Sequence, residues 1–461
     1  MGKRSLELII QKKVKQNDTK FSSFLLFLIG VFSETKIYFF GCLAISELVI
    51  FFVAPLIFVR DFHILKRTGF MPFIWMTTGL ICALFASGTY NHTPFFYSFG
   101  KFGLMYGFLA YFIVLSRLLR NNMKGIRWFL VGVFISSIII IYAFNPTLDR
   151  SGTGYIVSGS ANTDEIIEGQ LFWFSRFKSF MSIFVCGCYL EMPLLVSLLT
   201  PFLFVVIVAM TTPSGRSAVL TMLMGAVLMI ICGKNRKRMR WIGKYFVLLI
   251  IGGVTFIIAF KAAYSAAAKR GYLGEAALVK YEQQTRKGSG VVALVVAGRA
   301  KSFAGVPAAL EHPIMGWGMH PEDTVGSYER FLASYGDEKD MADYFSNKEK
   351  VMRSGGRMKI PLHSLLIGGW VTYGIFGLIY YLWVLYLLID HYRRFAAAIP
   401  QWFGYFAFAV PSYMWHVFFS PEGSRWGFGL LMACLFFARS VGSGKMWLPY
   451  DMEMQARRHE K

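Results

Sequence analysis

Charged residues are scarce in this chain. Asp, Glu, Lys and Arg make up 16% of its 461 residues, whereas a typical soluble domain contains about 25%. Hydrophobic residues reach 55%, aromatic residues 17%, and the mean hydropathy is +0.49. This composition excludes a disordered or collagen-like chain. Because one membrane span needs about 20 apolar residues, the hydrophobic residues suffice for about a dozen spans. The sequence therefore predicts an all-α polytopic membrane protein.

Acidic residues are scarcer than basic residues. The chain has 26 Asp and Glu against 48 Lys and Arg, which gives a formal net charge of +22. In a soluble protein this excess would suggest nucleic acid as a partner. In a membrane protein it is first expected in the cytoplasmic loops, which are enriched in Lys and Arg. We therefore expect membrane lipids, and no nucleic acid, as surroundings.

Cysteine is scarce as well, and all six cysteines fall in the spans predicted below, so they cannot cross-link an extracytoplasmic surface. Two of them are only two positions apart, which points them to different faces of a helix and does not favour a metal pair. We expect neither a metal nor a cofactor. The six are Cys42, Cys82, Cys186, Cys188, Cys232 and Cys434.

Twelve apolar segments are long enough to predict about 12 transmembrane helices. The first is expected to be retained, because Ser33-Glu34-Thr35-Lys36 is not a small-residue cleavage site. The segments are 21–33, 37–59, 70–88, 98–116, 128–144, 171–190, 193–210, 217–232, 242–260, 364–389, 400–419 and 426–440.

The distribution of Lys and Arg predicts the orientation of these spans. With twelve spans, the basic connections, such as the run Lys234–Arg240, all fall on one side, and the alternate short loops are nearly free of positive charge. Both termini are then cytoplasmic. The predicted division is an N-terminal membrane bundle of nine helices over 1–260, a long external loop over 261–363, three C-terminal membrane helices over 364–440 and a cytoplasmic tail over 441–461.

Two external loops stand out. The loop 261–363 contains helix-like stretches at Ala262–Ala268 and Gly298–Leu310. Loops of this length are usually functional rather than mere connections. The loop 145–170 is rich in Gly and Ser. It is interpreted either as a spacer or as a mobile cover.

Five basic residues fall in the outer half of the predicted spans, against the cytoplasmic bias. Their side chains either reach back to water and headgroups or bind an anion, since Glu47 is the only carboxylate well inside a span. A lipid-linked phosphate or diphosphate would lie at this depth, and Arg suits phosphate because its planar fork donates two hydrogen bonds. The five are Lys101, Arg176, Lys178, Arg216 and Arg425.

Three stretches carry candidate chemistry. The first is Thr211–Ala218, which reads TTPSGRSA and brings Arg216 to the start of a helix. The second runs from Gly298-Arg299 to the glycine turn EHPIMGWG at 311–318. The third is Pro361-Leu362-His363-Ser364, directly before a span with glycines at 374 and 377.

In this order and topology the stretches resemble the O-antigen ligase/polymerase family of bacterial inner-membrane glycosyltransferases. The resemblance covers about residues 211–380, and the insert Met319–Ile360 departs from it. It implies a GT-C-like fold, a periplasmic active site in the long loop and a donor glycan on undecaprenyl diphosphate. It also implies that no nucleotide sugar or metal ion is needed, and that the catalytic residues are Arg216, Arg299 and His363.

The residue chemistry fits this activity. Arg216 and Arg299 can stabilise the leaving diphosphate, with Arg176, Lys178, Lys101 and Arg425 as support, and His363 can accept the proton of the acceptor hydroxyl. The direction in which a basic site shifts the pKa of His363 stays open, so four carboxylates remain reserve bases: Glu282, Glu311, Glu322 and Asp323. Flat surfaces for sugars are expected at Trp317, Trp370 and Tyr373.

Several functions remain open. A ligase transfers the glycan to a lipid A-core sugar, and a polymerase transfers it to another lipid-linked glycan. The motifs do not separate the two, and the ligase is the slightly preferred interpretation. The alternative class is a flippase or exporter of the same lipid-linked glycans, for which cations spread through a central cavity would be expected. A metal-dependent protein glycosyltransferase ranks lowest, because the first external loop, about Ser33–Lys36, carries Glu34 as its only acidic residue.

Overall fold

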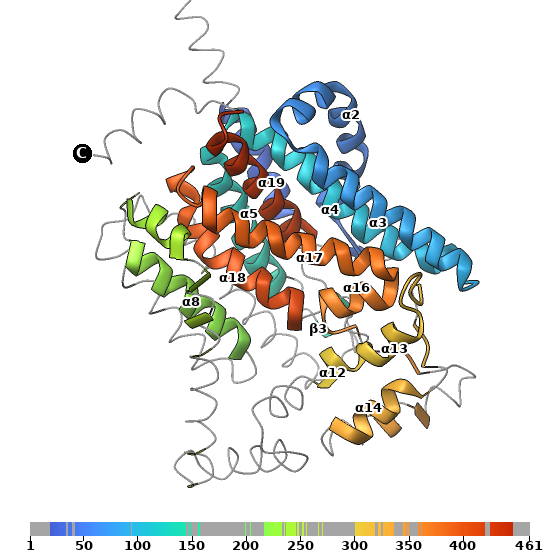
Figure 1. Ribbon diagram of the computed structural model, residues 1–461. Coiled ribbons are helices and arrows are strands. Elements are labelled where there is room, and N and C mark those ends of the chain that lie inside the picture. The colour runs from blue at the N-terminus through green and yellow to red at the C-terminus, as the bar shows by residue number, and fades with distance from the viewer. Residues whose placement is uncertain are drawn as a thin grey trace, which may run out of the picture.

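The computed structural model is mostly helical (Figure 1). Its named elements are β1 (Lys36–Tyr38), β2 (Cys42–Ala44), α2 (Ile45–Thr68), α3 (Met71–Tyr90), α4 (Phe95–Asn121), η1 (Met123–Gly125), α5 (Ile126–Ala143), β3 (Thr147–Leu148), β4 (Tyr155–Ile156), α8 (Arg216–Cys232), α12 (Ala300–Phe303), α13 (Gly305–Glu311), α14 (Ser327–Tyr335), α16 (Leu365–Tyr373), α17 (Ile375–Asp390), the π-helical turn η3 (His391–Phe395), η4 (Pro400–Trp402), α18 (Phe403–Phe419) and α19 (Arg425–Gly442).

The structure describes residues 19–33, 36–38, 42–93, 95–143, 147–148, 155–156, 199, 203, 216–232, 235, 237–245, 247–248, 251–252, 255, 266, 270, 300–318, 321–323, 326–335, 344–346, 348–349, 358–360, 362–419 and 425–445.

Four helices within these ranges are long and apolar enough to cross a membrane, which supports an all-α membrane protein. They are Ile45–Thr68, Met71–Tyr90, Phe102–Arg120 and Ile375–Phe395. Two further apolar helices, Thr19–Val31 and Thr221–Cys232, are shorter. The predicted spans 171–190 and 193–210 lie outside the described residues apart from 199 and 203, so the count of twelve stays a prediction.

The predicted span 37–59 is wrong at both ends. Its first residues lie in β1 and β2, which pair antiparallel in the register Lys36↔Ala44. Helix α2 therefore begins at Ile45, where the Glu47 carboxylate accepts a hydrogen bond from the Ala44 backbone N–H (2.8 Å). The helix continues to Thr68. Cys42 lies in β2 rather than in a span.

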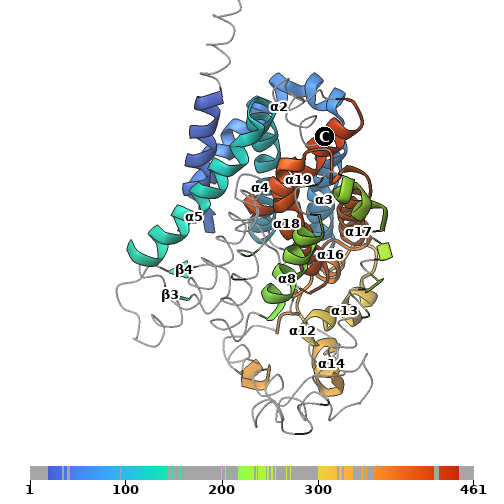
Figure 2. The same ribbon diagram turned by 90° about the vertical axis from the view of Figure 1, so that its left-hand side faces the viewer.

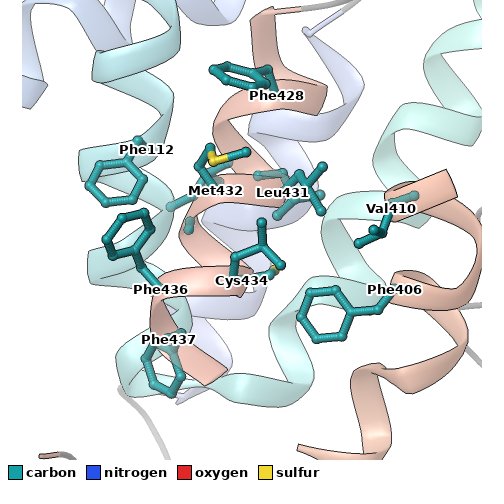
Figure 3. Packing of buried hydrophobic residues seen from close by; sticks show 14 of the residues in the cluster. Phe112, Phe406, Val410, Phe428, Leu431, Met432, Cys434, Phe436 and Phe437 are labelled. Carbon is teal, nitrogen blue, oxygen red and sulfur yellow. The ribbon is translucent and has the colours of Figure 1, made fainter. Parts of the chain in front are cut away.

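The core lies between α4 and α19, which run in the same direction. Gly429 of α19 has no side chain, so its backbone lies directly against Tyr111 and Phe112 of α4. Around this contact pack Phe428, Phe436 and other buried aromatic and aliphatic side chains (Figure 3). Close helix approach through small residues is a common packing mode within membranes.

Helix α8 packs antiparallel to α18. A side chain at Gly225 of α8 would strike the backbone of Ala407 and Phe408 in α18. Farther along, Gly243 lies equally close to the carbonyl groups of Tyr392 and Arg393. The Gly225 contact fixes the register between α8 and α18 and hence the level at which α8 begins, and the Gly243 contact joins the chain after α8 to η3.

The predicted span 364–389 is interrupted. Gly374 (φ 63°, ψ −148°) separates α16 from α17, in a backbone region that only glycine adopts readily. The turn Pro313–Gly318 of the long loop fills the break: the N–H groups of Trp317 and Gly318 donate to the carbonyls of Val371 (2.7 Å) and Thr372 (3.2 Å). In return, the Ile375 N–H donates to the carbonyl of Ile314 (3.1 Å).

The described part of the long loop forms a small domain, which we call the loop domain (300–318, 321–323, 326–335, 344–346, 348–349 and 358–360). The predicted helical stretch Gly298–Leu310 is confirmed in its described part as α12 and α13. The insert Met319–Ile360 contributes α14, whose Leu332 is buried with Ala308, Tyr344 and Val371. In both views α14 is the part farther from the helix bundle and α13 lies between them (Figures 1 and 2).

The smaller loop 145–170 contains the short antiparallel pair β3–β4, with Thr147 opposite Ile156. Its other residues lie outside the described ranges. Its interpretation as a spacer or cover stays a prediction.

We predict that Gly374→Ala destabilises the protein by about 1–3 kcal/mol or more, because alanine is strained at this φ and ψ and its Cβ would strike the Ile314 carbonyl. Thermal unfolding in detergent measures the effect. Gly79→Ala is the matched control: Gly79 lies inside α3 with open space around it, so alanine should be neutral or stabilise by about 0.5–1 kcal/mol. Equal unfolding temperatures for Gly374→Ala and the wild type would contradict the prediction.

Candidate functional site

His363 lies where α16 begins, at the end of the bundle that we call the His363 end. The next residue, Ser364, caps α16: its Oγ accepts from the Ile367 N–H (3.2 Å) and donates to the Val417 carbonyl of α18 (3.1 Å). Ser302 of α12 donates to the His363 carbonyl (3.2 Å). The backbone of His363 is thus held by α12, α16 and α18, while the residue as a whole is exposed.

Arg216 is the first residue of α8, and its backbone is the part that the structure describes. It lies nine residues before Gly225, which contacts Ala407. At 1.5 Å per residue this is about 13.5 Å, which brings Arg216 to about the level of Val417 on antiparallel α18. The backbones of Arg216 and His363 therefore reach the same end of α18.

The other predicted cations are less fully placed. Arg299, Arg176 and Lys178 lie outside the described residues. Arg299 directly precedes α12, the helix that holds the His363 backbone through Ser302. Lys101 lies in the second turn of α4. The structure thus brings the flanking helix of Arg299 to the site and leaves the side-chain geometry of these cations as predictions.

Arg425 is paired, which corrects one step of the sequence argument. Its Nε lies 2.9 Å from Oε1 of Glu47, with side-chain exposures of 15% and 3%. Gly107 of α4 makes room for it, because a side chain there would strike that of Arg425. The expectation that this cation needs a ligand anion is therefore wrong: Glu47 supplies the negative charge, and the pair joins α2 to α19 across α4.

The three aromatic residues expected to bind sugars serve the fold. Tyr373 is 1% exposed, so the expectation of a sugar surface there is wrong. The Trp317 indole donates to the Ala308 carbonyl (2.7 Å), and the Trp370 indole donates to the Pro313 carbonyl (3.0 Å). Both tryptophans are half-buried and fasten the turn Pro313–Gly318 to its neighbours.

Two of the reserve carboxylates accept hydrogen bonds that serve the fold. Glu311 accepts a hydrogen bond from Ser327, whereas at Glu322 the backbone forms a β-bridge with Lys359. Asp323 caps α14 by accepting from the Tyr328 and Glu329 N–H groups. Glu282 lies outside the described residues.

The ion pair Lys348–Glu329 in the loop domain is more exposed to solvent than the pair Arg425–Glu47. Lys348 donates to Glu329 (2.6 Å), and this hydrogen bond lowers the pKa of the Glu329 carboxyl. The two side chains are 34% and 32% exposed. Water and salt screen such a pair, so it contributes little to stability.

The opposite end of the bundle carries ion pairs that the sequence analysis did not single out. Asp61 of α2 is buried, and its carboxylate contacts the Nε atoms of Arg60 (3.3 Å) and Arg117 (3.2 Å). Asp390 and Arg394 pair one helical turn apart. Spacing of one turn could have identified the second pair, but the first joins two helices distant in sequence. Among the described residues, no group of three or more His, Cys, Asp or Glu is arranged to hold a metal ion.

No protein-family model matches the chain, and a search of curated proteins found no match either.

We predict that Arg425→Ala and Glu47→Ala each lower the free energy of unfolding by about 3–5 kcal/mol, because each leaves a buried charge without its partner. The double variant should lose less than the sum of the two. Denaturant unfolding in mixed micelles measures all three. Lys348→Ala is the control, since it breaks an exposed pair and should cost at most about 1 kcal/mol. A wild-type stability for Arg425→Ala would contradict the prediction.

Proposed function

We propose that the protein is an integral-membrane glycosyltransferase of the O-antigen ligase/polymerase type, with a GT-C-like fold. It transfers glycan from undecaprenyl diphosphate to an acceptor hydroxyl. In this proposal the protein resides in a bacterial inner membrane, both termini are cytoplasmic, and the His363 end faces the periplasm.

One observation carries the proposal. Three sequence stretches far apart in the chain converge on the end of α18: the start of α8 at Arg216, the helix that follows Arg299, and His363 itself. The hydrogen bonds of Ser302 and Ser364 join α12, His363 and α18, and the contact of Gly225 with Ala407 sets the level of α8 along α18. The stretches are those that resemble the glycosyltransferase family, so their convergence supports a shared site.

The reaction follows from these residues. The acceptor oxygen bonds to the anomeric carbon of the donor, and the bond from that carbon to the diphosphate oxygen breaks. His363 takes the hydroxyl proton, which requires its neutral imidazole. Arg216 and Arg299 stabilise the negative charge that collects on the departing undecaprenyl diphosphate.

The acceptor is either a lipid A-core sugar, which makes the protein a ligase, or a second lipid-linked glycan, which makes it a polymerase. A deletion strain separates the two. Without a ligase, polymer remains on undecaprenyl lipid; without a polymerase, single repeat units remain. A flippase, the alternative class, moves its substrate without forming a glycosidic bond, so bond formation by the purified protein excludes a function limited to transport.

We predict that Arg216→Ala, Arg299→Ala and His363→Ala each lower the transfer rate at least about 100-fold, while the protein still accumulates in the membrane. About 100-fold is the usual minimum contribution both of a general base and of one donor that stabilises developing charge. Arg216→Lys should not restore the rate fully, because an ammonium group lacks the planar fork of arginine. Initial rates with purified protein and lipid-linked glycan provide the measurement.

Two exposed residues supply matched controls. Arg330→Ala in α14 and His63→Ala near the opposite end of the bundle remove the same side-chain types from exposed positions, and both should keep the wild-type rate. A wild-type rate for any one of the three site variants would remove that residue from the mechanism.

A further inference from the structure

An exposed apolar stripe runs along α17. Phe376, Ile379, Leu382 and Tyr386 are 47–54% exposed. Their spacing of three, three and four residues places them on one face of the helix. Helix α17 belongs to the segment Ile375–Phe395, which is long and apolar enough to span a membrane, so this face is suited to contact with lipid.

The stripe continues beyond the helix onto the loop domain. Ile375, the first residue of α17, donates its backbone N–H to the carbonyl of Ile314 (3.1 Å). The Ile314 side chain is 65% exposed, and Leu310 at the end of α13 is 62% exposed. Trp370 also donates its indole N–H to the Pro313 carbonyl. An apolar surface of the loop domain therefore adjoins the first turn of α17.

The length of the span places this surface at a membrane boundary. From Phe395 to Ile375 there are twenty steps, about 30 Å of helix, which equals the thickness of the hydrocarbon core. Arg393 and Arg394 are exposed at the far end and mark one boundary. Ile314, hydrogen-bonded to Ile375, then lies at the other boundary.

A neighbouring helix ends at the same level. Asn91, which follows α3, donates its side-chain amide to the Gly316 carbonyl (2.9 Å), and the adjacent Tyr90 is 59% exposed. Tyrosine and tryptophan are enriched where membrane and water meet. Tyr90, Trp370 and Ile314 thus share the position expected for an interfacial belt.

We propose that the segment Leu310–Ile314 is an interfacial anchor, which inserts its apolar side chains between the lipid headgroups and acyl chains beside α17. Its partner is the bilayer surface on the His363 side. The anchor sets the height of the loop domain above the membrane, because α13 and the turn that follows it carry the inserted residues. This inference requires the membrane span α17 and does not depend on the glycosyl-transfer chemistry.

Cysteine modification tests the anchor in the full-length protein. Ile314→Cys and Leu310→Cys place a thiol in the proposed anchor, and Ser334→Cys places one on the exposed face of α14 as a matched control. Each variant is reconstituted in phosphatidylethanolamine–phosphatidylglycerol vesicles and treated with a water-soluble maleimide. Peptide mass spectrometry resolves each site from the native cysteines. We expect modification at 314 and 310 to be about tenfold slower than at 334, the contrast that 1.4 kcal/mol of lipid shielding would give, and a lipid-soluble maleimide to reverse the order.

Equal rates at positions 314 and 334 with the water-soluble reagent would overturn the proposal. Shielding that disappears when the protein is diluted tenfold in lipid would also overturn it, because a second copy of the chain would then be the occupant. A variant counts only if its unfolding temperature matches that of the wild type. If Ile314→Cys fails this criterion, Leu310→Cys decides the test by the same comparison.

Discussion

The break at Gly374 leaves backbone groups that need partners, and the loop domain supplies them. A buried N–H or C=O without a hydrogen-bond partner costs several kcal/mol. Trp317 and Gly318 donate to the last carbonyls of α16, and Ile314 accepts from the first N–H of α17. The long loop is therefore joined to the membrane bundle through backbone hydrogen bonds. Helix α12 belongs to the same domain. Its Ser302, which donates to the His363 carbonyl, is therefore also held in place relative to the membrane bundle.

Charge within the bundle divides into paired and exposed groups. Arg425 and Glu47 neutralise each other in a buried contact between helices, so this arginine supports the fold near the site. The proposed diphosphate site then relies on Arg299, whose following helix α12 contacts the His363 backbone, and on Arg216, which begins α8 at about the level of the same end of α18. Two arginines of this kind match the charge that a departing diphosphate develops, and a planar fork on each suits its oxygen atoms.

Local sequence patterns predicted the local features. Apolar length identified α3, α4 and α5 to within a few residues, and the glycines of the EHPIMGWG stretch predicted the turn at Gly316 (φ 71°) and Gly318 (φ 74°). Those signals depend on the residues of one segment. They hold wherever the segment lies in the fold.

Features that depend on residues distant in the chain could not be predicted from the sequence. The helix break at Gly374 requires a turn from sixty residues upstream to fill it. The strands before α2 lie in the apolar stretch 37–44, which by composition alone could equally begin the helix. Tyr373 is buried rather than available to a sugar because it packs in the hydrophobic core of the helix bundle. The Glu47–Arg425 pair joins residues 378 positions apart, so no local sequence pattern predicts it.

An in vitro reaction with a defined undecaprenyl-diphosphate glycan tests the central claim most directly. The purified wild-type protein, the lipid-linked donor and an acceptor glycan are combined with and without a metal chelator. We expect a new glycosidic bond and release of undecaprenyl diphosphate at the same rate in both reactions. Absence of product with every acceptor offered, or product that requires a divalent metal, would contradict the account.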